Sequence, residues 1–291
     1  MNGLVKGKHL VLLEYLLNGI LIGALYGLLA FPICVLFSST GYVDLAIGVY
    51  AIVAAMVAYV VGGTLGTALG LLAAVAVSSV TALVALRLDK VGSDHVTIVI
   101  ASYAVFVFLE SLVLTIHGKD PMIVRQFDNY LNVNGVLLDP QALLNFAICV
   151  ILLLLLFGML FSTSVGRDLR ASAVNPLGGE LAGVPVRVYW FCAYLLGGVL
   201  AGVAGVLLLH TVGLEYGGGM GLIIPAFGAA LLFGIKSPVR SFVGGIVIGV
   251  VQSLSAGYLD GGWVSAVPIL FIFAVLVWGR SNALGSQAGR V

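Results

Sequence analysis

The sequence predicts an all-α integral membrane protein, a polytopic bundle of about eight to nine transmembrane helices with interrupted segments near Asp44 and over 217–225. Of its 291 residues, 61% are hydrophobic and 9% are charged, whereas an average soluble domain has roughly 25% charged residues. Apolar runs of about twenty residues recur along the whole chain. Such runs cross a bilayer as helices, because a helix satisfies its own backbone hydrogen bonds inside lipid.

Apolar windows bounded by charges, glycine or proline mark nine segments that we expect to be helical: 15–37, 45–61, 66–86, 96–116, 141–161, 189–209, 222–235, 241–258 and 264–278. The segment 222–235 is short for a bilayer that needs about twenty residues. Glycines recur at four-residue spacing inside these runs, as in Gly198 and Gly202, and in Gly245 and Gly249. This spacing predicts close contact between helix backbones.

The polar stretch 162–188 interrupts the apolar pattern in the second half of the chain. Asn175 is suited to cap a helix, Pro176 to occupy its first position and Gly183 to end it, which predicts a short helix over 176–182. Spacing alone leaves two interpretations open. The stretch is either a docking surface or a solvated loop between two membrane spans.

The distribution of lysine and arginine indicates an orientation in the membrane. With 162–188 in the cytoplasm, 117–140 becomes the main external loop, the amino terminus lies outside and the carboxyl terminus lies inside. The inside positions are then Arg87, Lys90, Arg167, Arg170, Arg187, Lys236, Arg240, Arg280 and Arg290, against Lys6, Lys8, Lys119 and Arg125 outside. Because cytoplasmic loops carry the excess of basic residues, this orientation is favoured over the reverse.

Two interruptions at membrane depth predict a transport pathway. Asp44 lies between Gly41 and Gly48 where one apolar run ends and the next begins, and the segment 217–225 reads GGGMGLIIP. Paired interruptions in two halves of a chain are typical of a substrate path with exposed helix ends. The candidate pathway residues are Gly41, Tyr42, Asp44, Gly48, Glu110, Gly219 and Pro225.

Ionisable residues inside spans are functional candidates, because a centred charge costs about 3 kcal/mol on insertion scales. Asp44 and Glu110 meet this criterion, and Glu14 is a weaker candidate. The structural alternative for Asp44 is a capping role at the helix that starts at Leu45.

The sequence lacks the motifs of several other classes. There is no GxxxxGK[ST] phosphate loop, no serine nucleophile elbow and no HExxH, so we expect no catalytic residues and no ATP hydrolysis by this chain. Cys34, Cys149 and Cys192 lie inside expected spans and predict neither a disulfide nor a metal site. The net charge of +1, without a basic tract, indicates no nucleic-acid partner.

The stretch 166–205 carries a family resemblance. It contains Gly166 with Arg167, Arg170 with Ala171, Asn175 with Pro176 and 182–184 followed by Arg187, and it ends in a helix rich in alanine and glycine. With the early motif GYVDLAIG, these residues resemble the permease subunits of branched-chain amino acid ABC importers, particularly the LivH type.

The resemblance implies a single transmembrane permease domain over 1–291 in the bacterial inner membrane. It implies a pore shared with a second, similar permease, two cytoplasmic ATPases that bind ATP and magnesium, and an extracytoplasmic solute-binding protein. The helix 176–182 would be the coupling helix, with Arg167, Arg170, Asn175, Pro176, Glu180, Leu181 and Gly183 as the ATPase-coupling residues.

The substrate implied is a branched-chain or other hydrophobic amino acid, with amides or urea as further substrates within the family. The alternative of a different class is a stand-alone ion-coupled carrier, in which Asp44 and Glu110 bind a proton or a sodium ion. Uptake without any ATPase would distinguish it.

Overall fold

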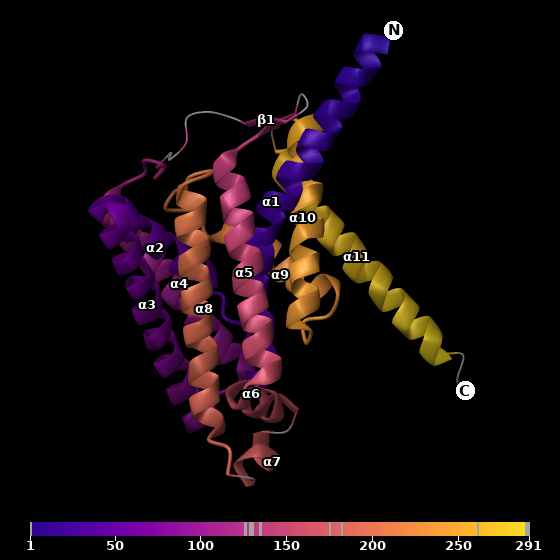
Figure 1. The fold of residues 1–291 in the computed structure, drawn as a ribbon. Helices are drawn as coiled ribbons and strands as arrows, with labels where there is room; N and C mark the ends of the chain where they lie inside the picture. The colour runs from indigo at the N-terminus through magenta and orange to yellow at the C-terminus, as the bar shows by residue number, and fades with distance from the viewer. Residues whose placement is uncertain are drawn as a thin grey trace.

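The computed structural model describes residues 2–288 except 125–126, 128–130, 134–135, 175, 182 and 261. Most helices of this part lie side by side in one bundle, with α6 and α7 at one end and the strands β1 and β2 at the other (Figure 1). In chain order the elements are α1 (Asn2–Thr40), α2 (Ile47–Val61), α3 (Gly63–Val91), α4 (His95–His117), β1 (Leu131–Val133), β2 (Val136–Leu138), α5 (Pro140–Ser162), α6 (Ser164–Val174), α7 (Pro176–Leu181), α8 (Val186–Leu209), α9 (Gly219–Leu232), α10 (Pro238–Tyr258) and α11 (Trp263–Ala288).

Each of the nine expected segments contains a helix, but the expected number of eight to nine membrane-spanning helices is not confirmed. In the described part, six helices are long and apolar enough to cross a bilayer: α1 from Val11 onward, α3, α4, α5, α8 and α10. The apolar helices α2, α9 and the Ala266–Val277 part of α11 are shorter. The 15 residues of α2 rise about 22 Å, less than the roughly 30 Å of a hydrocarbon core.

Glycines bring α1 and α10 into backbone contact. A Cβ atom added to Gly23 would lie 2.6 Å from the Cα of Ile246, and one added to Gly245 or Gly249 would overlap the backbone of Gly27 or Gly23. No side chain fits between these two helices at this level. The close contact that the spacing of Gly245 and Gly249 predicts is therefore confirmed.

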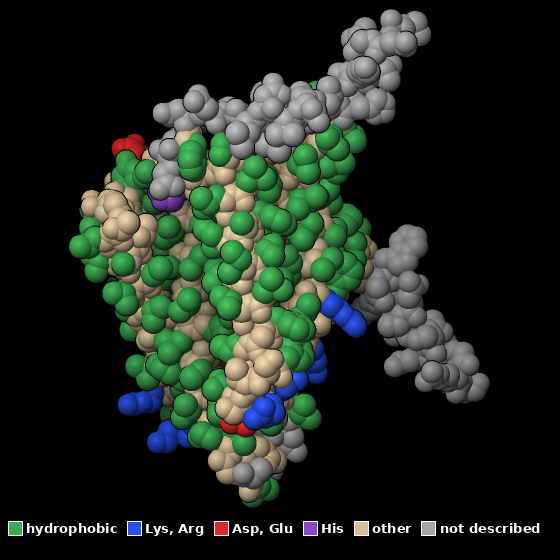
Figure 2. Space-filling view, viewed as in Figure 1, with side chains coloured by type: hydrophobic (Ala, Val, Ile, Leu, Met, Phe, Trp, Pro, Cys, Tyr) green, Lys and Arg blue, Asp and Glu red, His purple; other side chains and the backbone are tan. Residues whose placement is uncertain are grey.

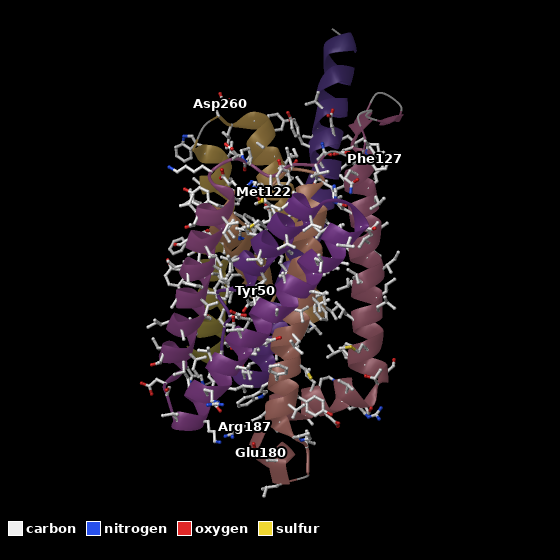
Figure 3. All side chains as sticks on the ribbon, turned by 90° about the vertical axis from the view of Figure 1, so that its left-hand side faces the viewer. Tyr50, Met122, Phe127, Glu180, Arg187 and Asp260 are labelled. Atoms are coloured by element: carbon white, nitrogen blue, oxygen red, sulfur yellow. The ribbon has the colours of Figure 1, made fainter. Side chains whose placement is uncertain are left out.

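The helix α8 packs against α2 and α3 in the same way. A Cβ atom on Gly198 would overlap the side chain of Ser78, and one on Gly205 would overlap the backbone of Ala51. The first half of α2 is consequently enclosed, and Tyr50 lies at its centre with no exposed surface (Figure 3).

The last helix leans away from the bundle (Figure 1). Its first part packs on α9, where the side chain of Ile272 fills the space left by Gly228. Farther along, the side chains of Phe273 and Val277 are exposed.

Two connections differ from the expectation of plain loops. The stretch 162–188 contains α6 in addition to α7, and α6 begins where the Thr163 hydroxyl accepts a hydrogen bond of 3.2 Å from Gly166 N. The loop 117–140 contains β1 and β2, which pair antiparallel with Leu131 opposite Leu138. The expected end of the short helix, Ala182, and the expected outside residue Arg125 lie outside the described residues.

The second interruption lies earlier than 217–225. The helix α8 ends at Leu209 and α9 begins at Gly219, so the break occupies 210–218 and Pro225 is a buried residue inside α9. A proline within a helix removes one backbone donor but does not always end the helix.

Candidate functional site

The first break comprises residues 41–46 between α1 and α2, and its polar groups are hydrogen-bonded within the protein. The Asp44 carboxylate is 1% exposed, and its two oxygens accept hydrogen bonds of 2.8 Å each, from Ala46 N and from the Tyr50 hydroxyl. Ser102 on α4 accepts a third bond, 3.1 Å, from Leu45 N. The helix α2 begins at Ile47 with Ala46 as its N-cap residue, so Asp44 does not cap a helix that starts at Leu45; its carboxylate instead holds the turn before α2 through Ala46 N.

The two breaks meet in the interior of the bundle. A Cβ atom on Gly48, near the start of α2, would overlap the carbonyl of Gly219 at the start of α9. Phe106 and Ile52 also pack on Gly219. A Cβ atom added to Gly219 would lie 2.7 Å from the Phe106 ring and 3.3 Å from the Ile52 Cδ1 atom. The start of α9 is therefore enclosed by α2 and α4.

Glu110 belongs to the same junction. Its carboxylate, on α4, lies close to the backbone N–H of Gly219, while its Oε1 atom is buried without a hydrogen-bond partner in the described part of the chain. A carboxylate at the amino end of a helix is stabilised by the helix dipole. The structure thus brings together Gly48, Glu110 and Gly219, while Asp44 lies four residues before Gly48 and Pro225 lies farther along α9.

Gly41 and Tyr42 lie on the side of the first break that faces α7. Gly41 ends α1 with a φ of +76°, and the Tyr42 hydroxyl donates a hydrogen bond to Asp89 near the end of α3. The Tyr42 ring contacts His95 edge-on, with ring centroids 4.8 Å apart, and Trp190 of α8 at 6.2 Å. Three helices therefore converge on Tyr42 in the first break: α3, α4 and α8.

The connection formed by α6 and α7 extends from the end of the bundle (Figure 1). Glu180 and Leu181 at the end of α7 are exposed, with 83% of Leu181 accessible. Gly183 follows with a φ of +83°, and Val184 N donates a 2.9 Å hydrogen bond back to Gly179 O, which ends the helix. Glu180 and Arg187 lie at this end, far from Met122 and Asp260 (Figure 3).

The arginines of α6 have different surroundings. Arg167 is exposed, whereas the Arg170 guanidinium lies 4.8 Å from the ring centroid of Phe161 and its Nε donates a 3.3 Å hydrogen bond to Gly166 O. Pro176 is the first residue of α7. Asn175, the expected cap, lies outside the described residues.

One residue pair that the sequence does not indicate joins this connection to the bundle. The Tyr189 hydroxyl of α8 donates a 2.6 Å hydrogen bond to the Asp168 carboxylate of α6. The next residue, Trp190, is the one that contacts Tyr42. The sequence spacing of Tyr189 and Trp190 does not predict their contacts with Asp168 and Tyr42. The only sequence signal is that these two aromatic residues follow the stretch that contains the arginines of α6.

Basic side chains gather toward the end that carries α6 and α7, while hydrophobic side chains cover the middle of the molecule (Figure 2). Arg87 and Lys90 are near the end of α3, Arg187 is at the start of α8, and Arg240 is in the first turn of α10. Among the described residues, no group of three or more histidine, cysteine or acidic residues could hold a metal ion.

A helical bundle in which two interrupted segments meet at the centre is typical of membrane transport proteins. The chain belongs to the family described as the permease component of the branched-chain amino acid transport system, whose model matches residues 15–277.

Relatives similar over nearly the full length have permease names. The chain is 27% identical over 300 residues to the high-affinity branched-chain amino acid transport system permease protein BraD of Pseudomonas aeruginosa, covering 94% of this chain and 95% of the relative. It is 25% identical to LivH of Escherichia coli, covering 96% and 97%. A nucleoside ABC transporter permease, NupC of Lactococcus lactis, is 25% identical over 54% of this chain and 52% of its own length.

Proposed function

We propose that the chain is the membrane permease subunit of an ATP-driven, binding-protein-dependent importer for branched-chain or other hydrophobic amino acids. The observation that carries the proposal is α7. This short helix stands outside the spanning helices at the basic end, exposes Glu180 and Leu181, and is flanked by two helices that lead into the bundle. Family membership and the names of the full-length relatives support the same function.

The α7 end is cytoplasmic in this proposal, since basic residues concentrate there. The amino terminus and 117–140 then face outward, and the carboxyl terminus faces inward. Two ATPases, which bind ATP and magnesium, dock on α7 and on Arg167 of α6. A solute-binding protein docks at the outer end, and a second, homologous permease completes the pore around the single domain formed by this chain.

Contacts behind α7 explain how it could move the helices. An added Cβ atom on the buried Gly179 would lie 3.3 Å from the Val186 side chain of α8 and 3.9 Å from Ser172 of α6, so α7 rests on both neighbours. Closure of the ATPases shifts α7, and the Tyr189–Asp168 bond transmits the shift to α8.

The substrate path in this proposal borders the junction of the two breaks. The backbone contact between Gly48 and Gly219 closes it, and separation of α2 from α9 opens it. Gly41, Tyr42 and Asp44 on one side, and Glu110, Gly219 and Pro225 on the other, then border the path.

The test uses the complete transporter in proteoliposomes, with leucine uptake and substrate-stimulated ATPase activity measured together. The double variant Glu180→Lys with Leu181→Asp should reduce both at least tenfold, because it reverses the charge and removes the apolar contact of α7. The matched control is Asp94→Asn, which neutralises an exposed acid at the N-cap of α4 with another favoured cap residue and should leave both activities unchanged. Normal uptake by the double variant would contradict the coupling role of α7.

The ion-coupled carrier is the less favoured alternative. Both oxygens of Asp44 are occupied by Ala46 N and Tyr50, so the carboxylate already has a structural partner on each side. Leucine uptake driven by a proton or sodium gradient in vesicles that contain no ATPase would favour the carrier and overturn the importer.

A further inference from the structure

A cavity of about 510 Å³ lies at the end of the bundle opposite α7. Its walls come from α1, the start of α5, the connection that follows α8, α10 and the start of α11. The volume falls within the roughly 300–1,000 Å³ that is usual for small-molecule sites. Its polar lining residues include Glu14, Asn18, Asp139, Asn145, Gln252 and Ser253.

The glycine contact between α1 and α10 holds two polar helix faces at this cavity. Glu14 and Asn18 are one turn apart on α1, and Gln252 and Ser253 lie one turn beyond Gly249 on α10. A Cβ atom on Gly19 would lie 3.1 Å from the Cβ of Ser253, so the helices approach closely directly beneath the polar residues. The cavity therefore adjoins the close contact between α1 and α10.

The cavity lining is acidic on balance. Among the described residues, two carboxylates, Glu14 and Asp139, line it, and no lysine or arginine does. One oxygen of Asp139 accepts a 2.9 Å hydrogen bond from Gln141 N, which leaves the other oxygen free. Glu14 is half-buried and has no hydrogen bond or ion pair within the described part of the chain.

A hydroxyl in the lining also lacks a partner among the described residues. Ser253 is only 8% exposed, yet it makes no hydrogen bond to any described residue. By contrast, Asn145, which is 1% exposed, accepts from Gln141 at 3.0 Å and donates to Leu207 O at 2.9 Å. The Ser253 hydroxyl and the Glu14 carboxylate are therefore available to a ligand in the cavity.

We propose that this cavity binds a zwitterion with a primary ammonium group, an inference that rests on the proposed function. Glu14 and the free oxygen of Asp139 accept from the ammonium group, while Ser253 and the Asn18 amide donate to the anionic oxygens. The apolar body of the ligand lies against Leu21, Ile22, Leu25, Val212 and Val264. Two sources supply this chemistry: an amino acid entering from the outer side, or the headgroup of an aminophospholipid.

The experiment measures binding of radiolabelled leucine to the purified full chain in nanodiscs of pure phosphatidylcholine, with no ATPase present. Leucine should bind. Leucinamide, which keeps the ammonium group, should compete better than 4-methylpentanoate, which lacks it. Glu14→Gln preserves shape but removes the charge, and it should weaken binding at least tenfold, the change expected for loss of about 1.4 kcal/mol. The matched control, Asp260→Asn, alters an exposed acid outside the cavity lining and should bind normally.

Nanodiscs that contain phosphatidylethanolamine separate the two sources. If the headgroup is the ligand, phosphatidylethanolamine copurifies with the wild-type chain, displaces leucine, and is lost from Glu14→Gln. If Glu14→Gln affects neither leucine nor phosphatidylethanolamine, the inference is overturned. ATP-driven uptake by the complete transporter would persist in that case, so failure of this site is distinct from failure of the proposed function.

Discussion

The Tyr189 hydroxyl donates a hydrogen bond of 2.6 Å to the Asp168 carboxylate, and this bond ties the start of α8 to α6. Trp190 follows directly and contacts the ring of Tyr42, two residues before Asp44. The start of α8 thus lies between the connection that carries α7 and the first break. In the proposed importer, it links the ATPase side to the pathway.

Removal of this bond should weaken coupling. In Tyr189→Phe the ring remains but the hydroxyl is lost, so α6 can shift without moving α8. We expect substrate stimulation of the ATPase to fall severalfold, because a single hydrogen bond to a charged group contributes about 1.5–3 kcal/mol. The protein should still fold, because the ring of residue 189 is retained.

A double-mutant cycle gives the control for this prediction. Asp168→Asn keeps an acceptor oxygen and should have a smaller effect than Tyr189→Phe. The combined variant should be no worse than Tyr189→Phe alone, since both changes act on one bond. Strictly additive effects on ATPase stimulation would contradict the link.

Asp44 should act through the fold rather than through its charge. Asp44→Ala leaves Ala46 N and the Tyr50 hydroxyl without their acceptors, and it should destabilise the protein by about 2 kcal/mol. Asp44→Asn retains an oxygen for Ala46 N and should lose less. The measurement is unfolding in detergent, followed by leucine uptake of the folded variants.

The uptake of Asp44→Asn distinguishes the structural role of Asp44 from the carrier alternative. An asparagine cannot take up or release a proton at physiological pH, so a carrier that depends on Asp44 would lose transport even when the variant is stable. Uptake by a stable Asp44→Asn protein supports the structural role.

The positions of the helices could be predicted because apolar length is a local property. Every expected segment contains a helix, and the break at Asp44 coincides with the glycines that flank it. The second break was misplaced because Pro225 suggested an interruption, whereas α9 accommodates this proline within its interior. The helix α6 was missed since Arg167, Asp168 and Arg170 give its sequence the polarity of a loop.

Contacts between distant segments could not be predicted in the same way. The acceptor of Tyr189 and the ring neighbours of Tyr42 depend on how helices cross, which no single segment encodes. The cavity beside Glu14 follows from the α1–α10 glycine contact together with the start of α5. Glycine spacing predicts that such a contact exists, but it does not identify the partner helix.

The contact between Gly48 and Gly219 gives the sharpest test of the pathway. A methyl group at position 48 would overlap the Gly219 carbonyl, which is backbone and cannot rotate aside as a side chain could. In Gly48→Ala the two breaks must separate, at a cost of about 1–3 kcal/mol for overpacking. We expect leucine uptake to fall at least tenfold while basal ATPase activity persists.

The matched control is Gly217→Ala, because no atom lies within 4 Å of a Cβ added there and its φ is not positive. Full uptake by both variants would show that α2 and α9 need not touch during transport, and the path would then have to lie elsewhere in the bundle.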